Sequence, residues 1–329
     1  MRVNVRQFFL CAAGSMLVLS GCTSGASQVG APTVVASGPS KAIQAVCNNQ
    51  PNLLYVSQSF ANTVNIYNNP AAPGNPAPLY TITASQGLNS PRGMIAQAGT
   101  TILYVANYGA QNVLLFKKCG TGPGATLIDA PFNPIDVAVT SGSSGAVYVS
   151  NFTAPSVTVF PLPSANYVSA LTLTDPNARS GMGITVDKFG DCFWSFLDNT
   201  GQGRVDRFVG CVMPGVTIAL FTPITGAPGG VQLDFPNNRL LLDGPNANRT
   251  YRIPSPWTGS PFLFPQATGA QPAFLSLRGN EGRLYVADPG NAAVQRYTYP
   301  GAVLQVPLTN GLTSTGGVNG VAVFPPAPL

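Results

Sequence analysis

The sequence predicts an all-β fold, a six-bladed β-propeller of four-stranded antiparallel blades. Three observations predict it. A short apolar strand occurs six times in the 329-residue chain, and its occurrences lie 44 to 49 residues apart. No segment after the N-terminal signal shows the apolar periodicity of a helix. Four strands in each interval, repeated around a ring, are typical of a propeller.

Each repeat contains the same succession of strands. The recurring strand is followed by a polar turn and a second alternating strand, which ends in an aromatic residue in five of the six repeats. Alternation rich in Val, Tyr and Phe between Gly, Pro and Asn turns predicts antiparallel pairing. The recurring strands are centred on Tyr55, Tyr104, Tyr148, Trp194, Leu241 and Tyr285, and their partners cover 63–67, 112–116, 156–160, 204–208, 249–253 and 293–297.

A third strand precedes each pair, and a fourth, outer strand follows it in most repeats. The preceding strands begin at turns, and we assign them to the inner edge of each blade. The inner strands are expected over 91–97, 134–140, 181–187, 229–235 and 272–278. The outer strands are expected over 79–83, 125–129, 169–174, 217–221 and 302–308.

Two segments compete for the inner position of the first blade. Either residues 41–46 or residues 316–325 can supply that strand. Closure by the C-terminal segment leaves no exposed sheet edge and uses a strand that otherwise has no partner. The sequence therefore favours closure of the ring by residues 316–325.

The N-terminus predicts export. Arg2 and Arg6 precede an apolar run over residues 8–19, which is too short to span a bilayer as a helix, and small residues then lead to Cys22. This pattern resembles the lipobox of bacterial lipoproteins, which implies cleavage before Cys22, diacylation of its thiol and attachment to the membrane. Thr23 at the next position implies the outer membrane of a Gram-negative bacterium. The expected domains are a lipoprotein signal peptide (1–21), the lipidated cysteine with a flexible linker (22–41) and the propeller (42–329).

The composition excludes several classes of function. The chain has no histidine, which rules out a Ser-His-Asp triad, a Cys-His pair and a His-ligated metal. After loss of the signal peptide, 14 basic residues face 11 acidic ones, a balance too weak to indicate nucleic-acid binding. The expected partners are the membrane, through Cys22, and a protein, a glycan or a small molecule.

Four cysteines remain after the signal peptide and Cys22 are set aside. An even number in an exported chain predicts disulfides. Cys192 and Cys211 are equidistant from the centre of the hairpin near residue 201, so we expect them to pair across it. Cys47 and Cys119 would then bridge the first two blades, although four cysteines by themselves allow three connectivities.

Three motifs carry a family resemblance. They are P-x-G/D before an alternating strand, Y-V-A/S-N/D, and N-x-V-x-x-Y/F, and they cover about residues 42–326. The repeats resemble the NHL and YVTN propeller families, with departures at FWSF in the fourth repeat and LLLD in the fifth. The resemblance implies a binding or interaction module, on a fold shared with gluconolactonase-like enzymes.

Ligands of propellers bind at the mouth of the central channel, where the inner strands begin. The side chains expected there are Arg92, Asp136, Met182 and Asn319. The gluconolactonase-like enzymes hold one divalent cation in the channel through a Glu, Asn residues and an Asp. Here the only Glu, Glu281, lies in a turn, and two oxygens from Asp136 and Asn319 are too few for calcium, which takes six to eight. The sequence thus predicts no catalytic residue, metal or cofactor.

Two sets of small or polar residues are assigned to the fold. Asn107, Asn151 and Asp288 follow strands and are expected to cap turns. Glycines in the inner strands are expected to let neighbouring strands approach closely. These glycines are at positions 93, 181, 183, 229, 230 and 320.

The expected function is that of a lipid-anchored binding module in the cell envelope. Two alternatives remain open from the sequence. One is a metal-dependent, lactonase-like hydrolase acting at the central channel through Asp136 and Asn319. The other is a passive envelope scaffold that assembles with partner subunits.

Overall fold

The computed structural model describes residues 41–326, except for 69, 71, 121–122, 129–131, 141–144, 163–168, 170, 219–223, 235–238, 245–247, 258–259, 279–281 and 314–316. The predicted signal peptide, Cys22, most of the predicted linker and Glu281 lie outside the described residues.

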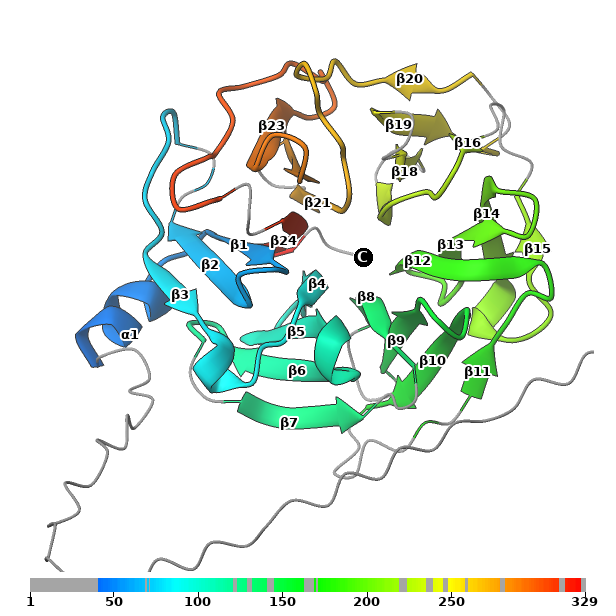
Figure 1. The fold of residues 1–329 in the computed structure, drawn as a ribbon, viewed down its shortest axis with the longest axis horizontal. Coiled ribbons are helices and arrows are strands. Elements are labelled where there is room, and N and C mark those ends of the chain that lie inside the picture. Colours follow the sequence, from blue (N-terminus) through cyan, green and yellow to red (C-terminus); the bar gives the residue numbers. More distant parts are fainter. Residues whose placement is uncertain are drawn as a thin grey trace, which may run out of the picture. The chain divides into compact units, whose positions relative to one another are not determined.

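Six antiparallel sheets follow one another around a common axis among the described residues (Figure 1). The predicted six-bladed propeller is therefore confirmed. The first three blades run from the inner to the outer strand as β24 (Val318–Phe324), β1 (Leu53–Gln58), β2 (Thr63–Asn68) and β3 (Tyr80–Ile82); β4 (Pro91–Ala96), β5 (Ile102–Asn107), β6 (Asn112–Lys117) and β7 (Pro123–Ile128); and β8 (Pro134–Val139), β9 (Ala146–Asn151), β10 (Ser156–Pro161) and β11 (Leu171–Leu173).

The other three blades have the same order, with weaker outer strands. In the sixth blade the outer segment is held by isolated bridges from Val294 to Leu308 and from Tyr297 to Leu304. The blades are β12 (Ala178–Val186), β13 (Cys192–Asp198), β14 (Gln202–Phe208) and β15 (Val216–Thr217), with β16 (Ile224–Thr225) also on β14; β17 (Val231–Asp234), β18 (Arg239–Gly244), β19 (Arg249–Pro254) and β20 (Phe262–Leu263); and β21 (Leu275–Arg278), β22 (Arg283–Asp288) and β23 (Ala293–Thr298). Short 3-10 turns are η1 (Ala84–Gln86), η2 (Tyr108–Ala110) and η3 (Val209–Cys211).

The C-terminal strand closes the ring, as the sequence favoured. β24 pairs with β1 in antiparallel register from Leu53 opposite Phe324 to Gln58 opposite Val318. Val318, Val321 and Val323 of this strand are buried in the core. The first blade is therefore built from both ends of the propeller sequence.

The competing segment is helical. α1 covers Lys41–Asn48, so the expectation that no helix follows the signal peptide is wrong. A helix of eight residues is too short to be stable alone, and tertiary contacts hold it. Cys47 is disulfide-bonded to Cys119, and the Lys118 ammonium donates to the carbonyl oxygens of Asn48 (3.1 Å) and Gln50 (2.5 Å) near its C-terminal end. No helix in the described part of the chain is long and apolar enough to cross a membrane.

Both predicted disulfides are present. Cys47 and Cys119 have Cα atoms 5.9 Å apart, and those of Cys192 and Cys211 are 5.0 Å apart. In the strand register Cys192 lies opposite Phe208, and the chain then turns back through η3 to bring Cys211 to it. The hairpin centre therefore predicted the correct pair, although the two residues are not register partners.

Glycines allow the inner strands of successive blades to touch. A Cβ atom added at Gly320 would lie 2.1 Å from the carbonyl oxygen of Arg92, and one added at Gly229 would lie 2.2 Å from that of Ala273. Both neighbours are backbone atoms of the next blade, which cannot move independently of it. The predicted close approach is confirmed at these positions.

We expect Gly229→Ala to lower the free energy of unfolding by about 2–3 kcal/mol, the range for an overpacked, rigid site. The added methyl group must push Ala273 away and separate blades five and six. Gly301→Ala is the matched control, because its Cβ would meet only the Thr298 hydroxyl at 3.4 Å. Urea denaturation of both variants measures the difference, and equal midpoints would contradict the packing argument.

Candidate functional site

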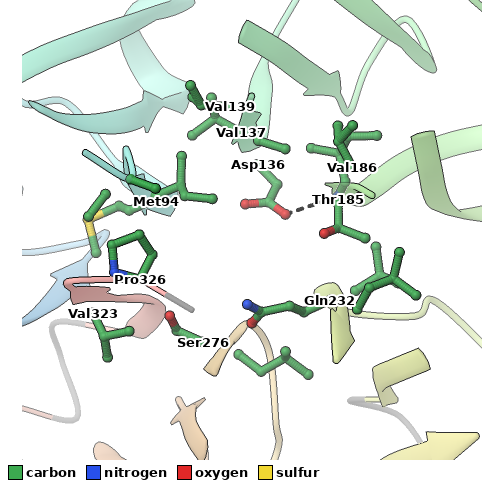
Figure 2. Close-up of a pocket in the computed structure, with 18 residues that line it drawn as sticks. Met94, Asp136, Val137, Val139, Thr185, Val186, Gln232, Ser276, Val323 and Pro326 are labelled. Carbon is green, nitrogen blue, oxygen red and sulfur yellow. Dashed lines mark hydrogen bonds between the residues drawn. The ribbon is translucent and has the colours of Figure 1, made fainter. Parts of the chain in front are cut away.

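A cavity lies on the propeller axis and is lined by the inner strands of all six blades (Figure 2). Its volume is about 70 Å³, enough for a few water molecules or a small ligand. Valine, leucine, isoleucine, alanine and methionine side chains form most of the wall. The polar side chains around it are those of Asp136, Thr185, Gln232 and Ser276.

Asp136 and Gln232 also connect neighbouring blades. A carboxylate oxygen of Asp136 accepts a hydrogen bond from the backbone N–H of Ile184 (3.0 Å), and the Gln232 side-chain oxygen accepts one from the N–H of Leu277 (2.8 Å). An inner strand pairs with its blade on one edge only, so N–H groups on its other edge, which faces the axis, need other acceptors. These two side chains therefore satisfy the backbone while they face the cavity.

Burial controls the protonation of Asp136. Its side chain is 7% exposed, and its carboxyl packs against Gly93, where a Cβ atom would clash with it. Burial raises the pKa of Asp136 to about 8, although hydrogen bonds from the N–H groups of Ile184 and Val137 oppose the shift. At neutral pH this carboxyl is mostly protonated.

We expect the protein to be more stable at pH 5 than at pH 8. The pKa of Asp136 is raised to about 8 in the folded state, and an unfolded aspartate has a pKa near 3.8. Between these values the folded chain alone binds the proton, so stability falls as the pH rises. Asp136→Asn should reduce the loss of stability between pH 5 and pH 8 by roughly 1 kcal/mol or more. Measurement of Tm as a function of pH for both proteins tests this. An identical slope in the variant would contradict the assignment.

Part of the slope should persist in that variant. Burial raises the pKa of Asp243 to about 8 and that of Asp206 to about 7, so both groups act with the same sign as Asp136. A completely flat profile for Asp136→Asn would therefore also disagree with the structure.

Arg92 and Asn319, predicted at the channel mouth, contact each other rather than the cavity. The Arg92 guanidinium donates to the Asn319 side-chain oxygen (2.7 Å) and lies 5.2 Å from the Tyr108 ring centre. The Asn319 amide donates to the Ser59 hydroxyl (2.6 Å). The cavity is lined by later residues of the same strands, such as Met94 of β4, so the pair lies toward the other end of the axis.

Apolar side chains fill that other end. Met182 packs against a buried cluster that includes Ile135, Phe274 and Val318. The remaining buried members of the cluster belong to the first and sixth blades, so Ile135 of the third blade must reach them across the axis. Of the four predicted channel residues, Asp136 alone lines the cavity.

Sequence reasoning missed Thr185, Gln232 and Ser276. They lie within the inner strands β12, β17 and β21, whereas the prediction considered only the starts of inner strands. The usable signal was a polar residue directly between two apolar residues of an inner strand. That signal locates a residue on the axis but does not say which end of the axis is open.

The Asn and Asp residues that follow strands are bound to nearby turns. Asn107 accepts from the N–H of Asn89 (2.6 Å), and Asp288 accepts from the N–H of Gln271 (2.8 Å) and from the Gln295 amide (2.6 Å). Asp288 also accepts from the N–H of Asn291 (3.3 Å) in its own turn, as predicted. Asn107 instead holds the preceding loop, and the Asn151 amide donates to the hydroxyls of Ser156 and Thr158 on the next strand. Within the described ranges, no three or more Cys or acidic side chains converge in a way that could hold a metal.

Comparisons with known proteins give the fold. No protein-family model matches the chain, and no curated protein matches it. A chain from a crystal structure of a nidogen/laminin complex aligns at 12% identity with a TM-score of 0.65, over 83% of this chain and 98% of that chain.

Two other solved structures are also similar. Regucalcin from Agrobacterium tumefaciens, described as a calcium-binding protein, aligns at 14% identity with a TM-score of 0.54, over 70% of this chain and 77% of that chain. A streptogramin B lyase aligns at 14% identity with a TM-score of 0.54, over 82% of this chain and 83% of that chain. At these identities the similarity concerns the fold.

Proposed function

We propose that this protein is a lipid-anchored propeller of the cell envelope that binds a small ligand in its central cavity. One observation carries the proposal: side chains from all six blades enclose a mostly apolar space into which a few polar groups converge. Concave apolar sites with a few convergent polar groups are the usual form of small-molecule sites. Propellers of similar fold include a calcium-binding protein and a lyase.

The ligand class follows from the wall of the cavity. Asp136 is the one ionisable side chain among its lining residues, and the surrounding wall is apolar. A small organic amine suits this combination, because its apolar body contacts the valines while its ammonium group replaces the proton on the Asp136 carboxyl. Binding then releases that proton, so the affinity for an amine rises with pH up to the pKa of about 8.

The test compares amines with hydroxyl analogues of the same shape on the purified full-length chain. Amines should raise Tm, the analogues should not, and the rise should be larger at pH 8 than at pH 6. Asp136→Asn should abolish the response. Asn319→Ala is the control, because Asn319 is remote from the cavity wall and should leave the response intact. The proposal fails if no amine raises Tm, or if Asp136→Asn responds like the unaltered chain.

The lipid anchor is supported by the signal and lipobox pattern that ends at Cys22. Eighteen residues separate Cys22 from Lys41, where α1 begins. A flexible chain of that length has a root-mean-square span of about 25 Å, enough to hold the propeller clear of a bilayer. Cys22→Ser should move the protein from the membrane fraction to the soluble fraction, and continued membrane association would argue against acylation at Cys22.

The lactonase-like alternative requires a cation in the same cavity, whose described wall supplies one carboxylate. Elemental mass spectrometry distinguishes it from amine binding. A stoichiometric divalent ion that is lost in Asp136→Asn would favour the hydrolase. A passive scaffold, by contrast, predicts that no cavity substitution alters any interaction of the protein.

A further inference from the structure

A second cavity lies where blade six meets the loop that follows β2 of blade one (Figure 1). Its volume is about 120 Å³, and none of its described lining residues lines the central cavity. The described wall contains two arginines and no acidic side chain. It consists of four residues of the loop between Pro70 and Gly74, Arg283 of β22, Arg296 of β23, and Gln305 and Val306 of the segment after β23.

The two arginines lie on one face of the sheet of blade six. Arg283 is the register partner of Thr298, and Arg296 is that of Tyr285, so the arginines are diagonal neighbours on adjacent strands. Such neighbours project from the same face and are typically about 7–8 Å apart. Burial lowers the pKa of Arg296, and repulsion from the Arg283 charge lowers it further. The two positive charges therefore interact unfavourably at the cavity.

Arg296 is buried, and its hydrogen bonds go to backbone carbonyl groups. The residue is 4% exposed. Its guanidinium donates to the carbonyl oxygens of Val306 (2.7 Å), Pro70 (3.1 Å), Ala72 (3.0 Å) and Gly74 (2.6 Å). These bonds use four of its five N–H donors. Carbonyl groups satisfy donors but carry no net charge, so the buried positive charge is still uncompensated.

No carboxylate in the described part of the chain forms an ion pair with either arginine. The three ion pairs found there join other arginines to aspartates. Arg283 is partly exposed and forms no side-chain hydrogen bond within the same residues. Two arginines and no acid give the described cavity wall a formal charge of +2, with N–H donors that are not used by the protein.

Asn75 holds the loop side of the cavity in place. Its side-chain oxygen accepts hydrogen bonds from the N–H groups of Thr309 (2.8 Å) and Asn310 (2.9 Å), and its amide donates to the Thr309 hydroxyl (2.7 Å). These bonds join the loop to the segment that follows blade six. The protein itself therefore keeps the cavity in shape, which lowers the cost of binding a ligand there.

A phosphate group suits this cavity. A phosphate monoester carries a charge of about −1.5 to −2 at pH 7 and three strong acceptor oxygens. The planar guanidinium of an arginine can donate two parallel hydrogen bonds to such a group. We propose that the cavity binds one phosphate group, which Arg283 holds directly and the buried charge of Arg296 stabilises. The bound group also relieves the repulsion between the two arginines.

Inorganic phosphate is the first probe. Calorimetric titration of the full-length chain at constant ionic strength should show one saturable site per chain. Arg283→Gln should weaken this binding by roughly tenfold or more, because it removes a charge-assisted hydrogen bond. Arg249→Gln is the matched control, since it removes the same charge from an exposed position outside the cavity and should leave the affinity unchanged.

Vesicles identify the source of the phosphate group, because inorganic phosphate and the headgroup of phosphatidic acid share its chemistry. The Cys22→Ser chain, in which the predicted anchor cannot contribute, is mixed with phosphatidylcholine vesicles with or without phosphatidic acid. Cosedimentation that requires phosphatidic acid and is lost in Arg283→Gln indicates a lipid headgroup. Saturable binding of inorganic phosphate without such cosedimentation indicates a soluble phosphate compound.

Three outcomes would overturn the proposal. They are an absence of saturable binding to both probes, binding that Arg283→Gln leaves intact, and an equal loss of binding in Arg283→Gln and Arg249→Gln. Asp136→Asn, in the central cavity, should bind phosphate like the unaltered chain. Failure of amine binding at the central cavity therefore leaves this site unaffected, because the two experiments use different ligands and different residues.

Discussion

Removal of residues 317–329 should abolish cooperative unfolding, because it deletes β24 and leaves the first blade without an inner strand. Val318, Val321 and Val323 lose their place in the core, and β1 loses its register partners from Leu53 to Gln58. Each fully buried valine contributes about 1.5–3 kcal/mol. Three of them approach the whole stability of an ordinary domain, about 5–15 kcal/mol. Calorimetry should show no transition comparable to that of the intact chain.

The matched control is a chain that ends at Pro326. It keeps all of β24 and its pairing with β1, so we expect it to unfold close to the Tm of the full chain. A synthetic peptide of residues 317–329 should partly restore the transition when it is added to the shorter chain. If the chain without β24 melts like the control, closure of the ring contributes little to its stability.

The disulfide between Cys47 and Cys119 should have the second largest effect. It spans 72 residues and joins α1 to the second blade. Its removal therefore gives the unfolded chain more conformational freedom than removal of a disulfide that closes a short loop. The chain-entropy relation gives about 4 kcal/mol for a loop of that size. The double variant Cys47→Ser and Cys119→Ser should therefore lower the free energy of unfolding by about that amount in urea denaturation.

The second disulfide provides an internal comparison. Cys192 and Cys211 are only 19 residues apart, for which the same relation gives about 3 kcal/mol. Their double serine variant should be less destabilised than the Cys47 and Cys119 variant by about 1 kcal/mol. The reverse order would indicate that local contacts around η3, rather than loop closure, determine how much these disulfides contribute to the free energy of unfolding.

The two ends of the propeller axis differ in chemistry. One end is filled by Ile135, Met182 and Phe274, with the Arg92–Asn319 pair nearby, and the other holds the cavity with Asp136. A ligand that enters the cavity therefore does not pass through the whole ring. This asymmetry explains why a prediction based on the starts of the inner strands located Asp136 in the wall and the other three residues elsewhere.

Much of the fold follows from the local pattern of the sequence. Period-two alternation, turn residues and a repeat of 44 to 49 residues are properties of short segments, and they predict strands, blades and their number. The closing strand also follows, because an unpaired edge is unfavourable wherever it lies. The position of α1 does not, since eight residues carry too little periodicity. The helix is held in place by the disulfide between Cys47 and Cys119 and by a hydrogen bond from the Lys118 ammonium.

The sequence by itself determined a six-bladed propeller. It favoured closure by the C-terminal strand, and it predicted two disulfides and close contacts between blades at glycines. Only the tertiary structure decided which end of the axis is filled and where the buried carboxyls lie. Ile135 and Phe274 belong to one buried cluster although 139 residues separate them in the chain, and Asp206 of β14 is fully buried. Alternation along a strand specifies which face a side chain occupies. Its burial and partners depend on contacts between residues far apart in the sequence, which no local pattern encodes.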